Sequence, residues 1–138
     1  MDIVLINVHA QTEEKELFYT ILEDVYESVK GNIILVLGDF NAEIGRERYY
    51  RSIIGNQSLY ELSNDNGTKL VNFAAAKGLV FKSTMLPRKD IHKYTWIAPN
   101  GVYKNQIDHI LINNRFKNTI KNIRTLRGAN TDSDHLLV

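Results

Sequence analysis

A run of aliphatic residues at 33–37 ends in Gly38-Asp39-Phe40-Asn41, and this segment narrows the choice of folds more than any other. A continuous apolar run of this length predicts a buried β-strand. Before it, residues 2–9 predict a strand, followed by a helix that Thr12 caps and that ends at Lys30-Gly31. A strand, a helix and a strand in this order predict an α/β layer.

The remaining sequence predicts further helices and strands in a single domain of 138 residues. The predicted first helix has one apolar face at helical spacing, formed by Leu17, Phe18, Ile21, Leu22, Val25 and Val29. After the buried strand we expect an irregular segment at 42–64, a helix from Asn64 or Asp65 to Gly78, a strand at 79–81, a basic loop at 83–92, a hairpin with arms at 94–97 and 102–113, and a last strand at 120–126. Asn100-Gly101 marks the hairpin turn.

Composition excludes several classes of site and leaves others open. The chain has no cysteine, which rules out disulfides, thiolate zinc sites and cysteine nucleophiles. The sequence has no apolar stretch of transmembrane length and no signal-peptide core, so we expect a soluble intracellular protein with no membrane partner. Residues 1–81 carry 7 basic and 12 acidic residues, whereas residues 82–138 carry 10 and 4. The basic second half suits either a polyanion or a solvated face.

Acidic residues at predicted strand ends are the candidates for chemistry. Asp39 and Asn41 follow the buried strand, where an acid and an amide suit a metal ion, a water or a phosphate. The alternative is that Asp39 caps a turn with Asn41 as its partner. Asp108 lies in an apolar strand and needs a hydrogen-bond donor, for which His135 is the candidate. Alternation along the strand places His109 on the opposite face, where we expect a structural role.

Three motifs occur in a fixed order: Gly38-Asp39-Phe40-Asn41, Gln106-Ile107-Asp108-His109-Ile110-Leu111 and Ser133-Asp134-His135. With Asn7-Val8-His9-Ala10 and Tyr94-Thr95-Trp96, the chain resembles the endonuclease/exonuclease/phosphatase superfamily from end to end. It is most similar to the apurinic/apyrimidinic-type endonuclease domains of non-LTR retrotransposons. The resemblance implies a DNase I-like α/β fold, a two-sheet β-sandwich flanked by helices, and metal-dependent hydrolysis of a phosphodiester.

The resemblance also implies a role for each matching residue. Asp39 would orient or deprotonate the attacking water, and Asn41 would bind a phosphate oxygen. His135 would stabilise the transition state, with its ring held by Asp108. His9 would supply a second donor to the phosphate.

The implied cofactor is Mg²⁺, which Mn²⁺ can replace, held by Asp134 and Asp39. The implied partner is DNA. Arg88, Lys89, Lys93 and Lys104 flank the hairpin and suit contacts to DNA phosphates. Trp96 suits either the core or the DNA surface.

The chain departs from the family at its N-terminus. Family members carry an asparagine and a metal-binding glutamate on earlier strands, whereas Glu13, Glu14 and Glu16 belong to a helix start. We therefore expect residues 1–138 to be the C-terminal portion of an incomplete domain, with weak or no activity alone. An exposed inner sheet face would favour pairing with the missing N-terminal half or with another chain.

Two other functions fit the same residues. One is an inositol-phosphate or lipid phosphatase of the same superfamily, and the other is a non-catalytic relic or interaction fragment. A retrotransposon origin would imply a nuclear location.

Overall fold

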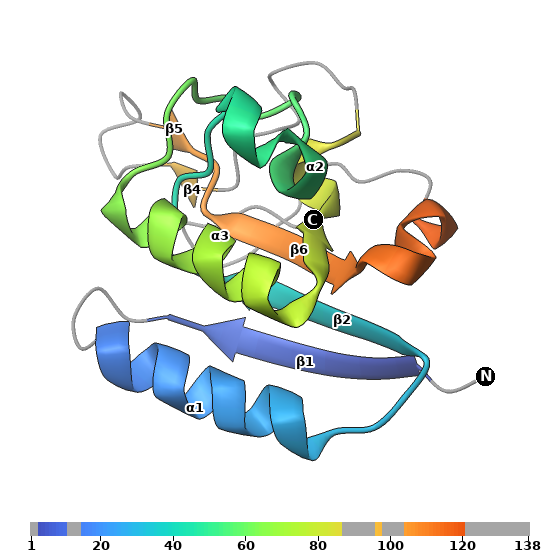
Figure 1. Ribbon diagram of the computed structural model, residues 1–138. Coiled ribbons are helices and arrows are strands. Elements are labelled where there is room, and N and C mark those ends of the chain that lie inside the picture. Colours follow the sequence, from blue (N-terminus) through green and yellow to red (C-terminus); the bar gives the residue numbers. More distant parts are fainter. Residues whose placement is uncertain (1–2, 11–14, 87–95, 98–103, 121–138) are drawn as a thin grey trace.

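A four-stranded mixed sheet forms the centre of the computed structural model, which describes residues 3–10, 15–86, 96–97 and 104–120 (Figure 1). The strand order is β1 (Ile3–His9), β2 (Ile33–Asp39), β6 (Asp108–Asn113) and β3 (Leu79–Phe81). β1 and β2 are parallel, whereas β6 is antiparallel to both β2 and β3. The predicted strand–helix–strand unit and the α/β class are confirmed.

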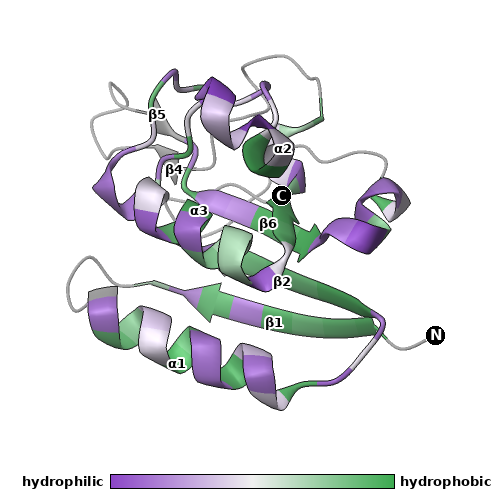
Figure 2. Ribbon diagram, in the orientation of Figure 1, coloured by the Kyte–Doolittle hydropathy of each residue, from purple (hydrophilic) through white to green (hydrophobic). Residues whose placement is uncertain are grey.

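Most of the length of the central strands is apolar, as their hydropathy colouring shows (Figure 2), and the register places one apolar row on each face of the sheet. One face packs against the helices α1 (Lys15–Ser28) and α3 (Asp65–Lys77), and its central row is Ile6, Val36, Leu111 and Phe81. The row on the other face is Leu5, Leu35, Ile112 and Val80. Such rows follow from the two-residue period of strands.

The apolar face of α1 is oriented differently from the prediction. Leu22 is buried and Phe18 packs against the core, but Leu17 and Ile21 are more than half exposed. The core side of α1 is completed by the aromatic residues Tyr19 and Tyr26, which the aliphatic spacing did not include. The helix ends at Ser28, short of Lys30, and the predicted cap Thr12 lies outside the described residues.

The ends of α3 agree with the sequence signals. Asn64 caps the helix by accepting a hydrogen bond from the Gly67 N–H at 2.7 Å. Gly78 ends it in the left-handed conformation, with φ of 69°. The short strand β3 then follows as predicted.

The segment at 42–64 contains two short helical turns, η1 (Arg48–Tyr50) and α2 (Arg51–Ile54), in otherwise irregular chain. Its apolar residues Ala42, Ile44 and Ile54 are fully buried in the main core. Burial therefore holds this segment in place despite its lack of regular structure.

The predicted hairpin arm at 102–113 is divided between two sheets. β4 (Trp96–Ile97) pairs with β5 (Lys104–Asn105), as the hairpin requires. The chain then leaves the ladder at Gln106 and Ile107 and continues as β6 in the central sheet. The predicted single strand was wrong because the two halves of the arm pair with different partners.

The other elements are the 3₁₀ helices η2 (Lys82–Thr84) and η4 (Asn114–Thr119). The hairpin turn at 99–101 and nearly all of the strand predicted at 120–126 lie outside the described residues. The two-sheet sandwich stays a prediction, because the described strands form the central sheet and one two-stranded ribbon. Within the described ranges, no helix combines the length and apolar character needed to span a bilayer.

Candidate active site

The strand register brings three of the predicted site residues side by side. His9 is the partner of Asp39 in the parallel β1–β2 pair, and Asp39 is the partner of Asp108 in the antiparallel β2–β6 pair. Partners in register share a sheet face. The ends of β1 and β2 and the start of β6 therefore place an imidazole and two carboxylates in one row.

The Asp39 carboxylate links this row to the turn after β2. Its Oδ2 lies 3.7 Å from His9 Nδ1, and its Oδ1 accepts a hydrogen bond from the Asn41 N–H at 2.8 Å. The predicted turn contact between Asp39 and Asn41 is thus present together with the histidine contact. The His9 side chain is 74% exposed, so it can meet a ligand from solvent.

Asp39 and Asp108 form a close cross-strand pair. The flanking hydrogen bond runs from the Phe40 N–H to the Ile107 carbonyl at 3.1 Å, which makes the two acids a non-hydrogen-bonded pair. Residues in such pairs have the closer of the two antiparallel Cα spacings, and like charges in facing positions repel. A cation or a hydrogen-bond donor beside the pair would relieve this repulsion.

Gly38 allows the strands to approach closely just before the row. Its φ is +131°, and an added Cβ would lie 2.2 Å from the Val8 carbonyl oxygen. Asn41 also has positive φ, at 49°, immediately after the strand. A glycine is needed at position 38 for steric reasons.

The N-terminus of α3 clamps the chain that leaves the site. Asn66 Nδ2 donates to the Asn41 carbonyl at 2.7 Å, and Asn64 Oδ1 accepts from the Glu43 N–H at 3.2 Å. An added Cβ on Gly67 would lie 1.9 Å from the Glu43 carbonyl oxygen. Sequence reasoning missed this clamp, because Asn64-Asp65-Asn66-Gly67 indicates a helix start and does not reveal its tertiary contacts.

His109 has the structural role that alternation predicted. It is fully buried, with Nε2 2.8 Å from the Ala42 carbonyl oxygen and Nδ1 3.1 Å from Ser83 Oγ. Because a carbonyl only accepts, Nε2 carries the proton and Nδ1 accepts from the serine hydroxyl. His109 therefore anchors the segment after Asn41 to η2.

Gln106 anchors the C-terminal part of the 42–64 segment. It belongs to one of the sequence motifs, which did not predict this role. Its buried Oε1 accepts from the Leu59 N–H at 3.2 Å, and its backbone N–H donates to the Tyr60 hydroxyl at 2.8 Å. Burial raises the pKa of Tyr60 to about 12, so this hydroxyl stays neutral at physiological pH. These contacts hold the segment against the start of β6.

The remaining predicted site residues lie outside what the structure describes. Asp134, His135, Arg88, Lys89 and Lys93 fall in undescribed ranges, while Trp96 and Lys104 are placed by their backbone in β4 and β5. Among the described residues, no group of three His, Cys, Asp or Glu side chains is arranged to hold a metal ion. The oxygen donors in the row suit Mg²⁺ chemically but form at most part of a coordination shell.

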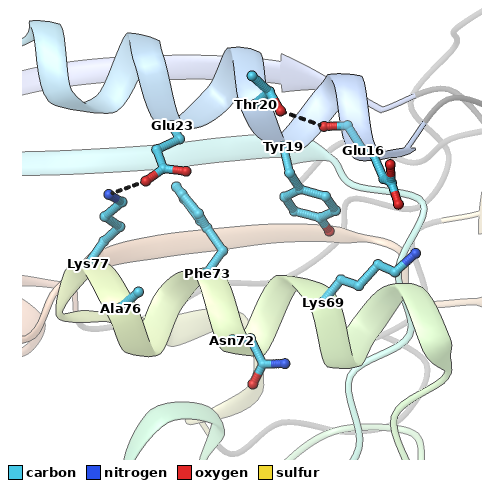
Figure 3. A pocket seen from close by; sticks show the side chains of 9 residues that line it. All are labelled: Glu16, Tyr19, Thr20, Glu23, Lys69, Asn72, Phe73, Ala76 and Lys77. Atoms are coloured by element: carbon cyan, nitrogen blue, oxygen red, sulfur yellow. Dashed lines mark hydrogen bonds and ion pairs between the residues drawn. The ribbon is translucent and has the colours of Figure 1, made fainter.

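Two clefts border helix α1. One, of about 320 Å³, is mainly apolar and extends along β1 from Ile6 to His9. The other, of about 510 Å³, lies between α1 and α3 and contains none of the predicted catalytic residues (Figure 3). Its Lys77 is already paired with Glu23 at 3.0 Å and Glu27 at 2.6 Å, which raises the pKa of the lysine. We interpret the second cleft as a helix–helix junction.

A known nuclease domain shares this fold. The endonuclease domain of TRAS1, a telomere-specific non-LTR retrotransposon, superimposes with a TM-score of 0.62 at 16% sequence identity. The match covers 94% of this chain and 50% of that domain. The chain thus shares the fold of this endonuclease domain, in agreement with the DNase I-like fold that the motifs imply.

Two curated proteins are similar in sequence along almost the whole chain. Craniofacial development protein 2 of Bos taurus is 32% identical over an alignment of 143 positions, which covers 99% of this chain and 24% of that protein. The protein of the same name from Tragulus javanicus is 31% identical over an alignment of 143 positions, which covers 25% of its length. The chain therefore spans about a quarter of these relatives. No family model matches it.

Proposed function

We propose that this chain carries part of the active site of a DNA endonuclease of retrotransposon type. The observation that supports this function best is the row of His9, Asp39 and Asp108 at three adjacent strand ends. The likeness in fold to a retrotransposon endonuclease domain favours DNA as the substrate.

In this proposal Asp39 orients the attacking water and accepts its proton, in a position held by the Asn41 N–H. His9 donates to a phosphate oxygen from its exposed position beside Asp39. The side chain of Asn41 binds a second phosphate oxygen. Asp108 holds the ring of His135, which stabilises the charge that develops in the transition state.

The proposed cofactor is Mg²⁺, with Mn²⁺ as a substitute, and Asp39 and Asp134 are its proposed ligands in this chain. A bound divalent cation would neutralise charge on the phosphate and at the leaving oxygen. Further ligands would come from other parts of the domain. We also propose that Arg88, Lys89, Lys93, Lys104 and Trp96 contact the duplex, and that the protein acts in the nucleus.

A further proposal concerns the edge of the central sheet. β1 is the outer strand of the described sheet, and its Ile3 and Leu5 are 61% and 65% exposed. The adjoining cleft is lined by Ile21 and Val25 of α1, so both sides of this edge are apolar. We propose that a β-strand from the rest of the endonuclease domain, half of which has no counterpart here, pairs with β1.

Nicking of supercoiled plasmid by the purified chain tests the proposed reaction. We expect weak cleavage that needs Mg²⁺ or Mn²⁺ and stops with a chelator. Asp39→Asn should lower the rate at least about 10-fold, because it removes the base. Asp24→Asn, an exposed acid on α1, should leave the rate unchanged.

Other outcomes separate the alternative functions. Nicking that is unchanged in Asp39→Asn would contradict the proposal. Faster hydrolysis of an inositol phosphate than of DNA would favour the phosphatase function. No metal-dependent change in melting temperature, together with no hydrolysis of either substrate, would favour a non-catalytic fragment.

A further inference from the structure

Three arginines line a small pocket on the segment that follows the site. The pocket has a volume of about 220 Å³ and is lined by Arg46, Arg48, Arg51, Gly55 and Asn56. These residues belong to η1, α2 and the chain on either side of them, between β2 and α3 (Figure 1). The candidate site residues contribute nothing to it.

The pocket concentrates positive charge that the described residues barely neutralise. Within the described chain, neither Arg48 nor Arg51 forms an ion pair, and Arg46 meets Glu61 at 3.8 Å. That glutamate is 89% exposed, so the pair is weak. Like charges gathered in one pocket repel each other and lower the stability of the fold unless an anion binds there.

The acid next to these arginines points elsewhere. Glu47 is buried, and its two carboxylate oxygens accept hydrogen bonds from the backbone N–H and the hydroxyl of Ser63, at 2.9 Å and 3.0 Å. The Glu47 carboxylate therefore binds Ser63, and it forms no ion pair with Arg48.

The backbone around the pocket is held in place before any ligand binds. The Arg46 N–H donates to the Glu61 carbonyl at 2.9 Å, and Arg46 Nε donates to the Tyr60 carbonyl at 3.0 Å. On the other side, the Gln57 N–H donates to the Thr84 carbonyl at 2.9 Å. A site ordered in advance loses less entropy on binding.

The chemistry of the lining indicates the ligand. Guanidinium groups present planar forks of N–H donors that match phosphate oxygens. The volume is below the range of about 300–1,000 Å³ that is typical of pockets for whole small-molecule ligands. A single phosphate group, with the rest of its molecule outside, fits this combination of size and charge.

We propose that Arg46, Arg48 and Arg51 bind a backbone phosphate of duplex DNA away from the bond that is cut. This inference rests on the proposed endonuclease function. The segment that carries the arginines is joined to Asn41 and fastened by His109, Gln106 and the α3 clamp. A phosphate held there would set the position of the duplex relative to Asp39.

Duplex binding by the double variant Arg48→Gln/Arg51→Gln tests the inference. We expect its affinity for a fluorescent duplex to fall at least about 10-fold at about 100 mM salt, and the slope of log K against log salt to decrease by about 1. Arg115→Gln, at an exposed arginine of η4 outside the pocket, is the matched control and should bind within about 2-fold of the parent chain. Circular dichroism verifies that each variant is folded.

Inorganic phosphate distinguishes a site for DNA from a site for a free anion. We expect phosphate to compete with the duplex in the parent chain and to compete less in the double variant. Unchanged duplex affinity in the folded double variant would overturn the inference. Phosphate binding that the double variant loses without any change in duplex affinity would also overturn it, because the site would then serve a free anion.

The same variants separate this inference from the proposed reaction. If Asp39→Asn abolishes nicking while the arginine variants bind DNA normally, the endonuclease function stands and the arginine site fails. If the arginine variants lose DNA affinity while Asp39→Asn leaves nicking unchanged, the reaction assigned to Asp39 fails and the phosphate site stands.

Discussion

Gly38 shows how one residue allows the candidate site to form. It has positive φ, and the Val8 carbonyl occupies the space where a side chain would begin. The next residue, Asp39, must lie in register with both His9 and Asp108. A side chain at position 38 would push β1 away from β2 and separate the members of the row.

We therefore expect Gly38→Ala to destabilise the protein by about 3 kcal/mol, because strain and the clash add. Gly78→Ala is the control, since Gly78 also has positive φ but an added Cβ meets nothing within 4 Å. That variant should lose only about 1 kcal/mol. Urea unfolding measures the free energy of unfolding of both variants. Equal losses of stability would show that steric contact with β1 is unimportant.

At the scale of elements, the N-terminus of α3 holds the chain after β2. The contact from Asn66 Nδ2 to the Asn41 carbonyl joins residues 25 positions apart in the sequence. Within the described residues the buried Asn66 Oδ1 has no hydrogen-bond partner, so this side chain has one unsatisfied acceptor. This cost is consistent with a positioning role for its amide donor.

Asn66→Ala should lower the free energy of unfolding by about 1 kcal/mol, because a buried carbonyl loses its donor. The expected loss is at the low end of the range for a lost buried hydrogen bond, because the substitution also removes the unsatisfied Asn66 Oδ1. Asn72→Ala, at an exposed asparagine of the same helix, should change stability by less than about 0.5 kcal/mol. Denaturant unfolding of the two variants makes the comparison, and a larger effect at Asn72 would contradict the clamp.

At the scale of the whole molecule, β1 is an outer strand of the described sheet, and its edge is apolar and exposed. Its sequence, IVLINVH, has none of the lysines or prolines that protect edge strands in many proteins. Ile3 and Leu5 are exposed on one side of the edge, with Ile21 and Val25 exposed on the other. An isolated chain with such an edge should self-associate.

We expect Leu5→Lys to shift the chain toward monomer, because a charge on the edge opposes strand pairing. Leu62→Lys is the matched control, since Leu62 is 73% exposed in the 42–64 segment, away from the edge. Sedimentation velocity at tens of micromolar protein compares the three chains. A parent chain that is already monomeric would contradict the proposed exposure of an unpaired edge.

Local signals in the sequence predicted most of the described fold. Asn64 and Gly78 marked the ends of α3 because capping depends on neighbouring residues. The buried strand β2 was evident from its own composition, since both of its faces pack against apolar groups. The prediction of one continuous hairpin arm was wrong because the chain changes pairing partners at Gln106 and Ile107, between β5 and β6. Strand pairing is a non-local property.

The candidate site divides in the same way between local and tertiary information. By itself the sequence determined which residues are candidates for the chemistry, since carboxylates, amides and histidines at strand ends are visible in the motifs. The structural role of His109 was also visible, because alternation along a strand is local. Tertiary structure alone decided that His9, Asp39 and Asp108 stand in one row, that Asn66 holds Asn41, and that three arginines share a pocket. The physical reason is that register, helix docking and loop packing depend on contacts between residues distant in the chain, which no local pattern encodes.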